Sequence, residues 1–141
     1  MALAAAQVID ALAARVATLG AAGGTHTSRA WPLATLPAWR VFAQDEAVSE
    51  AMLSGVNEHA LDVDVQGTVH ATADLDDELN AMAAAALVAL FVAPVPHQLQ
   101  LLGIQRRPAT EGEASVGRVT VRVRATFYVD PVAPETIVPT L

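Results

Sequence analysis

The chain is expected to form a single α+β domain, in which two helices pack on one face of an antiparallel or mixed sheet of four to five strands. Its 141 residues suffice for one sizeable hydrophobic core but not for two. Two Ala-rich segments repeat apolar residues at helical spacing, and two others alternate apolar and polar residues as half-exposed strands do. We expect residues 1–130 to form the domain and residues 131–141, with three prolines, to be an extended or disordered tail.

The first helix is predicted over Ala2 to Leu19, because Ala is the best helix former and is abundant there. Gly20 is expected to end it, since a left-handed backbone costs glycine little. The apolar face of this helix would carry Ile9, Leu12, Val16 and Leu19.

An extended segment is predicted next, over Ser28 to Ala43. Pro32 and Pro37 each push the preceding residue away from helical geometry, and Ala38 to Ala43 is expected to be a strand. We expect Trp39, within this strand, to pack in the core. The stretch Gln44 to Asn57 fits neither a helical nor a strand period and is predicted as a loop or irregular element.

The central strand and the second helix have clearer patterns. From His59 to His70, apolar residues alternate with Asp62, Asp64, Gln66 and Thr68, which predicts a half-exposed antiparallel strand. Thr72 or Asp74 offers a helix N-cap, and the acids that follow suit the positive end of a helix dipole. The apolar stripe of this helix would be Leu75, Leu79, Met82, Ala86 and Leu90.

The C-terminal third is predicted to be a strand pair. Gln98 to Gln105 can form a strand, Pro108 to Gly117 is expected to be a hairpin loop, and Arg118 to Val129 alternates strictly. The polar sheet face would then carry acids on one strand and arginines on another, which could pair across strands or between subunits. These residues are Asp62, Asp64, Arg118, Arg122 and Arg124.

Composition argues against several classes of function. The chain has no Cys, and its net charge of −7 disfavours nucleic-acid binding by the whole surface. Its longest apolar stretch, Ala81 to Val95, is shorter than the roughly 20 residues of a membrane span, and the N-terminus lacks the basic region of a signal peptide. We expect no membrane association and no export.

Motifs for catalysis are missing from the sequence. It contains no phosphate-binding loop, nucleophile elbow or metalloprotease motif, and its four His residues are scattered. We therefore predict no catalytic, cofactor-binding or metal-ligating residues and no cofactor. Arg106 and Arg107 could contact phosphate, but a basic pair beside a hairpin loop is usually solvated.

Four segments carry a resemblance to a known family. They are QVIDALAARVATL, SRAWPLATLPAWRVF, LDVDVQGTVHATADLDDELNAMAAAAL and VGRVTVRVRATFYV. Taken in order, over nearly the whole chain, they resemble the tail-terminator proteins of long-tailed phages, also called minor tail or tail-completion proteins. The resemblance implies a non-enzymatic virion protein that assembles in the host cytoplasm.

The resemblance implies a hexameric ring that caps the head-proximal end of the tail tube, stops its polymerisation and joins the head. Its partners would be copies of itself, the tail-tube protein and a head-completion or connector protein, with DNA passing through the lumen without specific binding. Carboxylates lining the lumen would repel that DNA. The candidate structural motif consists of Arg29, Trp31, Pro32, Leu33, Pro37 and Trp39. The candidate contacts with neighbouring subunits or with the tube are Asp62, Asp64, Arg106, Arg107, Arg118, Arg122 and Arg124. The loops Gln44 to Asn57 and Arg106 to Gly117 are candidate contacts as well.

Two other functions fit the same sequence. A head-tail connector or a tail-tube subunit would also form rings from small α+β domains. A small ligand-binding domain or enzyme would instead need a pocket in which polar groups from distant parts of the sequence converge.

Overall fold

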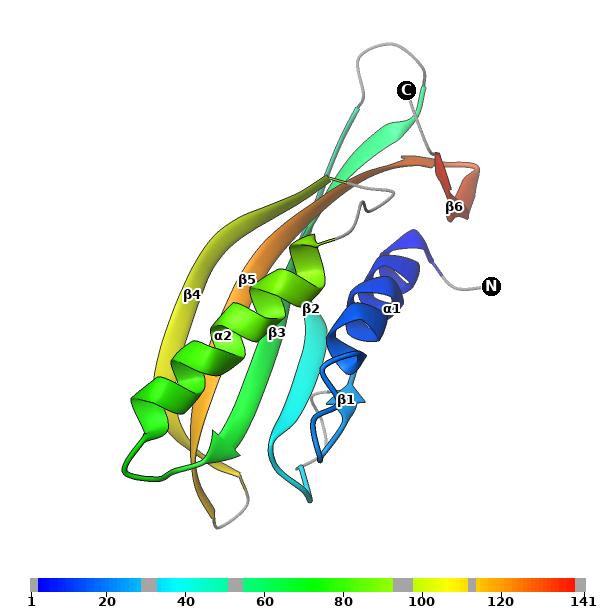
Figure 1. Ribbon diagram of the computed structural model, residues 1–141. Helices are drawn as coiled ribbons and strands as arrows, with labels where there is room; N and C mark the ends of the chain where they lie inside the picture. Colours follow the sequence, from blue (N-terminus) through cyan, green and yellow to red (C-terminus); the bar gives the residue numbers. More distant parts are fainter. Residues whose placement is uncertain (1–2, 29–32, 51–54, 93–97, 112–113, 139–141) are drawn as a thin grey trace.

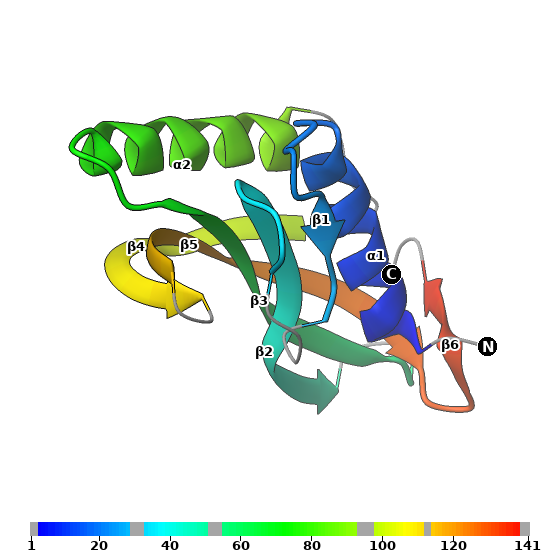
Figure 2. The same ribbon diagram turned by 90° about the horizontal axis from the view of Figure 1, so that it is seen from below.

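A strongly curved sheet with two helices on one of its faces makes up this protein, as seen in a computed structural model that describes residues 3–28, 33–50, 55–92, 98–111 and 114–138 (Figures 1 and 2). We call the face without helices the outer face. The elements are α1 (Ala4–Ala17), β1 (Thr25–His26), β2 (Ala38–Glu50), β3 (Asn57–His70), α2 (Leu75–Phe91), β4 (Gln98–Glu111), β5 (Ala114–Asp130) and β6 (Ala133–Val138).

The sheet is mixed and, within the described residues, has six strands in the order β1-β2-β3-β5-β4, with β6 also paired to β5. Of the strand pairs that the structure describes, only β1–β2 is parallel. The predicted count of four to five strands was therefore too low. The additional strands are short, because β1 has two residues and β6 has six, and neither is long enough to show a clear alternation. Strand β6 falls within the segment expected to be an extended or disordered tail.

Two segments predicted as loops are largely strand. β2 continues to Glu50 through a bulge between Ala43 and Asp45. The extra residue shifts the alternation by one position, which explains why the sequence from Gln44 fitted no period. Likewise β4 runs to Glu111 and β5 starts at Ala114, so most of the predicted loop Arg106 to Gly117 is a paired hairpin.

The core lies between the helices and the inner face of the sheet. Alternate residues of β3 and β5, among them Val63, Val123 and Phe127, are almost fully buried against α1 and α2. Helix α2 contributes small residues, Ala83 and Ala86, which allow close approach to the sheet. The buried face of α1 is Ala4, Val8, Leu12 and Val16, so the predicted Ile9 and Leu19 lie at its margin. Asp74 precedes α2 as the predicted N-cap residue, without a capping side-chain hydrogen bond.

Candidate interaction surfaces

Two arginine–aspartate pairs cross the outer face between β3 and β5. The register places Asp62 opposite Arg124 and Asp64 opposite Arg122. Arg122 donates from Nε to Asp64 Oδ1 over 2.7 Å and from an amino group to Oδ2 over 3.0 Å. Arg124 binds Asp62 in the same two-point manner, over 2.8 and 3.3 Å. These pairs lie within one chain, so the opposed charges noted in the sequence join neighbouring strands.

The Asp64 pair is the better protected of the two. The Asp64 side chain is 5% exposed, whereas that of Asp62 is 19% exposed. Gln44, the bulged residue of β2, also donates to Asp64 Oδ2 over 2.7 Å. The hydrogen bond to Asp64 and the attraction of its charge raise the pKa of Arg122. Asp64 therefore connects β2, β3 and β5 on the outer face.

The neighbouring residues Arg106 and Arg107 lie on opposite faces of β4. Arg106 pairs in register with the buried Val119 and donates to Asn80 Oδ1 of α2 over 2.8 Å. Arg107 lies opposite Arg118 and, with Arg122, lines a polar hollow of about 570 Å³ on the outer face. The structure thus brings Arg107, Arg118, Arg122 and Asp64 together and separates Arg106 from them.

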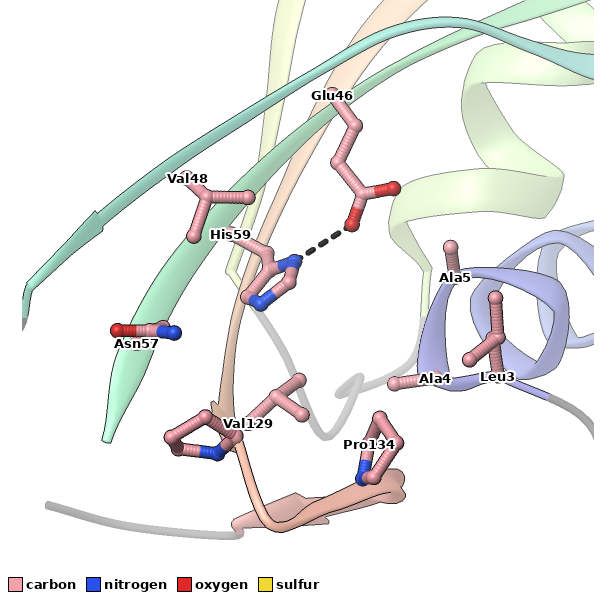
Figure 3. Close-up of a pocket in the computed structure, with 10 residues that line it drawn as sticks. Leu3, Ala4, Ala5, Glu46, Val48, Asn57, His59, Val129 and Pro134 are labelled. Atoms are coloured by element: carbon pink, nitrogen blue, oxygen red, sulfur yellow. Dashed lines mark hydrogen bonds and ion pairs between the residues drawn. The ribbon is translucent and has the colours of Figure 1, made fainter. Parts of the chain in front are cut away.

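A second cavity, of about 320 Å³, lies on the helix side at the N-terminal end of α1 (Figure 3). His59 Nδ1 and Glu46 Oε2 are 2.6 Å apart on its wall, and the His59 ring stacks on Phe127 with a centroid separation of 5.3 Å. The sequence did not indicate this pair, because the bulge in β2 decides that Glu46 faces the helices. The described residues that line this cavity contain no hydroxyl or thiol group.

The exposed large apolar side chains of the described residues fall into two groups along the chain. The α2–β4 patch comprises three residues at the C-terminal end of α2 and two in the first half of β4, which are 38–73% exposed: Val88, Phe91, Val92, Leu101 and Leu102. The terminal patch comprises Leu3 and Val48, which line the His59 cavity, and Val132, which follows the lining residue Pro131; the three side chains are 55–87% exposed. In Figures 1 and 2, the C-terminal end of α2 and the start of β4 lie near the middle of the molecule, and the N-terminus with β6 lies to the right.

The candidate structural motif is described in part. Trp39 is buried in the core. Pro37 accepts a 2.8 Å hydrogen bond at its carbonyl from the Gly23 amide, and Leu33 lines a small hollow beside it. Arg29, Trp31 and Pro32 lie outside the described residues. The described part of this motif positions the start of β2 against β1.

No protein-family model and no curated protein matches this chain. Among the described residues, no group of three or more His, Asp or Glu side chains is arranged to hold a metal ion. Neither α1 nor α2 is both long enough and apolar enough to cross a membrane.

Proposed function

We propose that this protein is a ring-forming structural subunit of a phage tail, which caps the head-proximal end of the tail tube, stops its polymerisation and offers a surface for head joining. The observation that carries this proposal is that the exposed large apolar side chains of the described residues fall into two groups, one at the end of α2 and the start of β4 and the other at the His59 cavity and the β5–β6 turn. A closed ring needs two different, complementary surfaces on each subunit, because each subunit meets its two neighbours through opposite sides.

The distribution of exposed apolar residues supports this reading. Among the described residues, eight large hydrophobic side chains are exposed, and five of them form the α2–β4 patch while three form the terminal patch. Scattered apolar residues are normal on a protein surface, but grouped ones usually indicate contact sites. We infer that the α2–β4 patch of one subunit packs against the terminal patch of the next.

The β4 edge of the sheet supports a closed ring of subunits rather than an endless β-sheet that grows by strand addition. β4 lies at the end of the strand order. It contains Pro108, which lacks an amide donor, and a bulge between Leu101 and Gly103. Both features interrupt a continuous strand addition, as do charged residues such as Arg107. We therefore expect subunits to join through side chains rather than through an endless β-sheet.

Native mass spectrometry and negative-stain imaging test the proposal, with the protein alone and mixed with a tail-tube subunit from the same phage. A closed ring, or a monomer that caps and shortens tubes, is the expected result. Long tubes formed by the protein alone would make it a tube subunit instead. A monomer that ignores tubes would contradict the proposal.

A small ligand-binding function is the second candidate, favoured by the His59 cavity. Its wall combines apolar side chains with the His59–Glu46 pair, as ligand sites often do. A ligand that binds the folded state would raise the melting temperature by mass action in a metabolite screen. Replacement of His59 by Phe should abolish such a shift while keeping a ring stacked on Phe127.

A further inference from the structure

The floor of the His59 cavity is formed by three strands in register. His59 of β3 lies directly opposite Val48 of β2 and Phe127 of β5. Its ring stacks on that of Phe127, which is almost fully buried, with an angle of 20° between the ring planes. The side walls come from the start of α1 and from the β5–β6 turn and the strand after it, and they are Leu3, Ala4, Ala5, Pro131 and Pro134. The imidazole is therefore held in place on the floor of a cavity with apolar sides.

The contact with Glu46 determines the tautomer of His59. A carboxylate only accepts hydrogen bonds, so Nδ1 donates to Glu46 Oε2 over the 2.6 Å that separate them. In the neutral imidazole Nε2 then carries no hydrogen and presents a lone pair. Figure 3 shows Nε2 on the side of the ring away from Glu46, toward Asn57 and Val129. Glu46 thus makes Nε2 a hydrogen-bond acceptor.

This acceptor is suited to a donor from a ligand. None of the described contacts of His59 involves Nε2, although the side chain is only 17% exposed. Asn57 lines the same cavity two residues earlier on β3, and its amide group can donate as well as accept. A hydroxyl group matches both side chains, because it donates through its hydrogen and accepts through its oxygen.

The rest of the cavity suits an apolar ring. The cavity measures about 320 Å³, and an apolar cavity of about 150 Å³ is enough to hold benzene. Val129 on the floor and the two prolines of the wall offer flat apolar surfaces to such a ring. A phenolic hydroxyl, with an ordinary pKa of about 10, is also a stronger donor than an aliphatic one. Together these features favour a phenol over an aliphatic alcohol.

We propose that the His59 cavity binds a small neutral phenol, whose hydroxyl group donates to Nε2 of His59 and accepts from the Asn57 amide. The ring of the phenol packs against Val129 and Pro134. Glu46 is a positioning residue, because it acts on the ligand only through the imidazole. The inference rests on the second candidate function and deepens it by naming the class of ligand. It does not require ring formation, since all of these residues belong to one chain.

Ligand-observed NMR titrations of the full chain with p-cresol and with toluene test the site, at about pH 8, where a free imidazole is neutral. Toluene has the same ring and methyl group but no hydroxyl. His59→Phe keeps a stacked ring and removes the acceptor, so it should weaken p-cresol binding about tenfold relative to toluene. His70→Phe is the matched control, because it makes the same replacement at the exposed end of the same strand.

The ¹⁵N resonances of His59 provide a readout that does not depend on affinity. They should show a protonated Nδ1 and an unprotonated Nε2 in the free protein, and p-cresol should shift the Nε2 resonance. Glu46→Leu should remove the tautomer preference and weaken p-cresol binding less than His59→Phe does. A protonated Nε2 in the unmodified chain would contradict the proposal.

A Val92→Asp variant distinguishes failure of this site from failure of ring assembly. It breaks the proposed subunit contact and leaves every cavity residue unchanged. If p-cresol binds to this variant alone, the site exists and a neighbouring subunit covers it in the ring. The absence of rings would leave the ligand site intact. The proposal is overturned if p-cresol shows saturable binding to neither form, or if His59→Phe and His70→Phe change the preference for p-cresol over toluene equally.

Discussion

Trp39 and Gly67 face each other across β2 and β3, and the indole ring of Trp39 occupies the space that a side chain at position 67 would fill. A Cβ atom at Gly67 would lie 2.9 Å from Cζ3 of Trp39 and 2.7 Å from the Met82 methyl group of α2. Glycine at this position thus allows a large aromatic side chain to pack between the sheet and the second helix.

Gly67→Ala should destabilise the protein by about 1–3 kcal/mol, because Trp39 and Met82 must move to admit the methyl group. Urea unfolding followed by tryptophan fluorescence measures the change. Gly103→Ala in β4 is the control, since nothing lies within 4 Å of a Cβ at that position. Equal midpoints for both variants would refute the packing argument.

Asp64→Asn should reduce stability by about 1–2 kcal/mol, because it leaves the Arg122 charge without its carboxylate while solvent screens the half-exposed guanidinium. Asp62→Asn should cost less, since Asp62 is more exposed and the described contacts give it no partner comparable to Gln44. Because the pKa of Arg122 is raised in the folded protein, its charge contributes fully to the free energy of unfolding at neutral pH. This contribution is lost only when the pH becomes strongly alkaline. Thermal melts at neutral pH rank the two variants, and a larger loss for Asp62→Asn would contradict this account.

Ala86→Leu should destabilise the fold by about 1–3 kcal/mol, because Ala86 is fully buried where α2 meets the sheet. The larger side chain would push the helix outward. Ala84→Leu, on the exposed side of the same helix, should leave the unfolding midpoint nearly unchanged. Differential scanning calorimetry of both variants checks the prediction, which fails if the two melting temperatures agree.

Val92→Asp should shift the assembly from ring to monomer, because it places a charge in the centre of the proposed contact between subunits. Native mass spectrometry reports the distribution of assembly states. Ala11→Asp, on the exposed side of α1 and outside both patches, should form rings like the unmodified protein. A Val92→Asp variant that still forms rings would show that the α2–β4 patch is not the contact.

Much of the fold could be predicted where a strand keeps a regular alternation. The alternation in β3 and β5 predicted both the buried residues and the charged outer face, including Asp64 and Arg122. Helix boundaries were close to those observed, since Ala content and the acids after Asp74 are local signals.

The remaining features depend on pairing between segments that are distant in sequence. Neither the His59–Glu46 pair nor the opposition of Arg107 and Arg118 leaves a local pattern, because each follows from the register of two strands. The length of β2 was underestimated for a related reason, since a bulge interrupts its period. A strict alternation in the sequence indicates a strand, but its interruption does not indicate a loop.

The bulge at Gln44 decides which side chains in the second half of β2 face the helices. Before it, odd-numbered residues such as Val41 face the helices, and after it the even-numbered Glu46 and Val48 do. Loss of Gln44 would remove the bulge and restore a regular alternation, in which Glu46 and Val48 still face the helices but the hydrogen bond from Gln44 to Asp64 is lost. Gain of one residue between Gln44 and Glu46 would instead exchange the two faces over the rest of the strand and turn Glu46 away from His59, so a one-residue insertion here should be tolerated less well than the loss of Gln44.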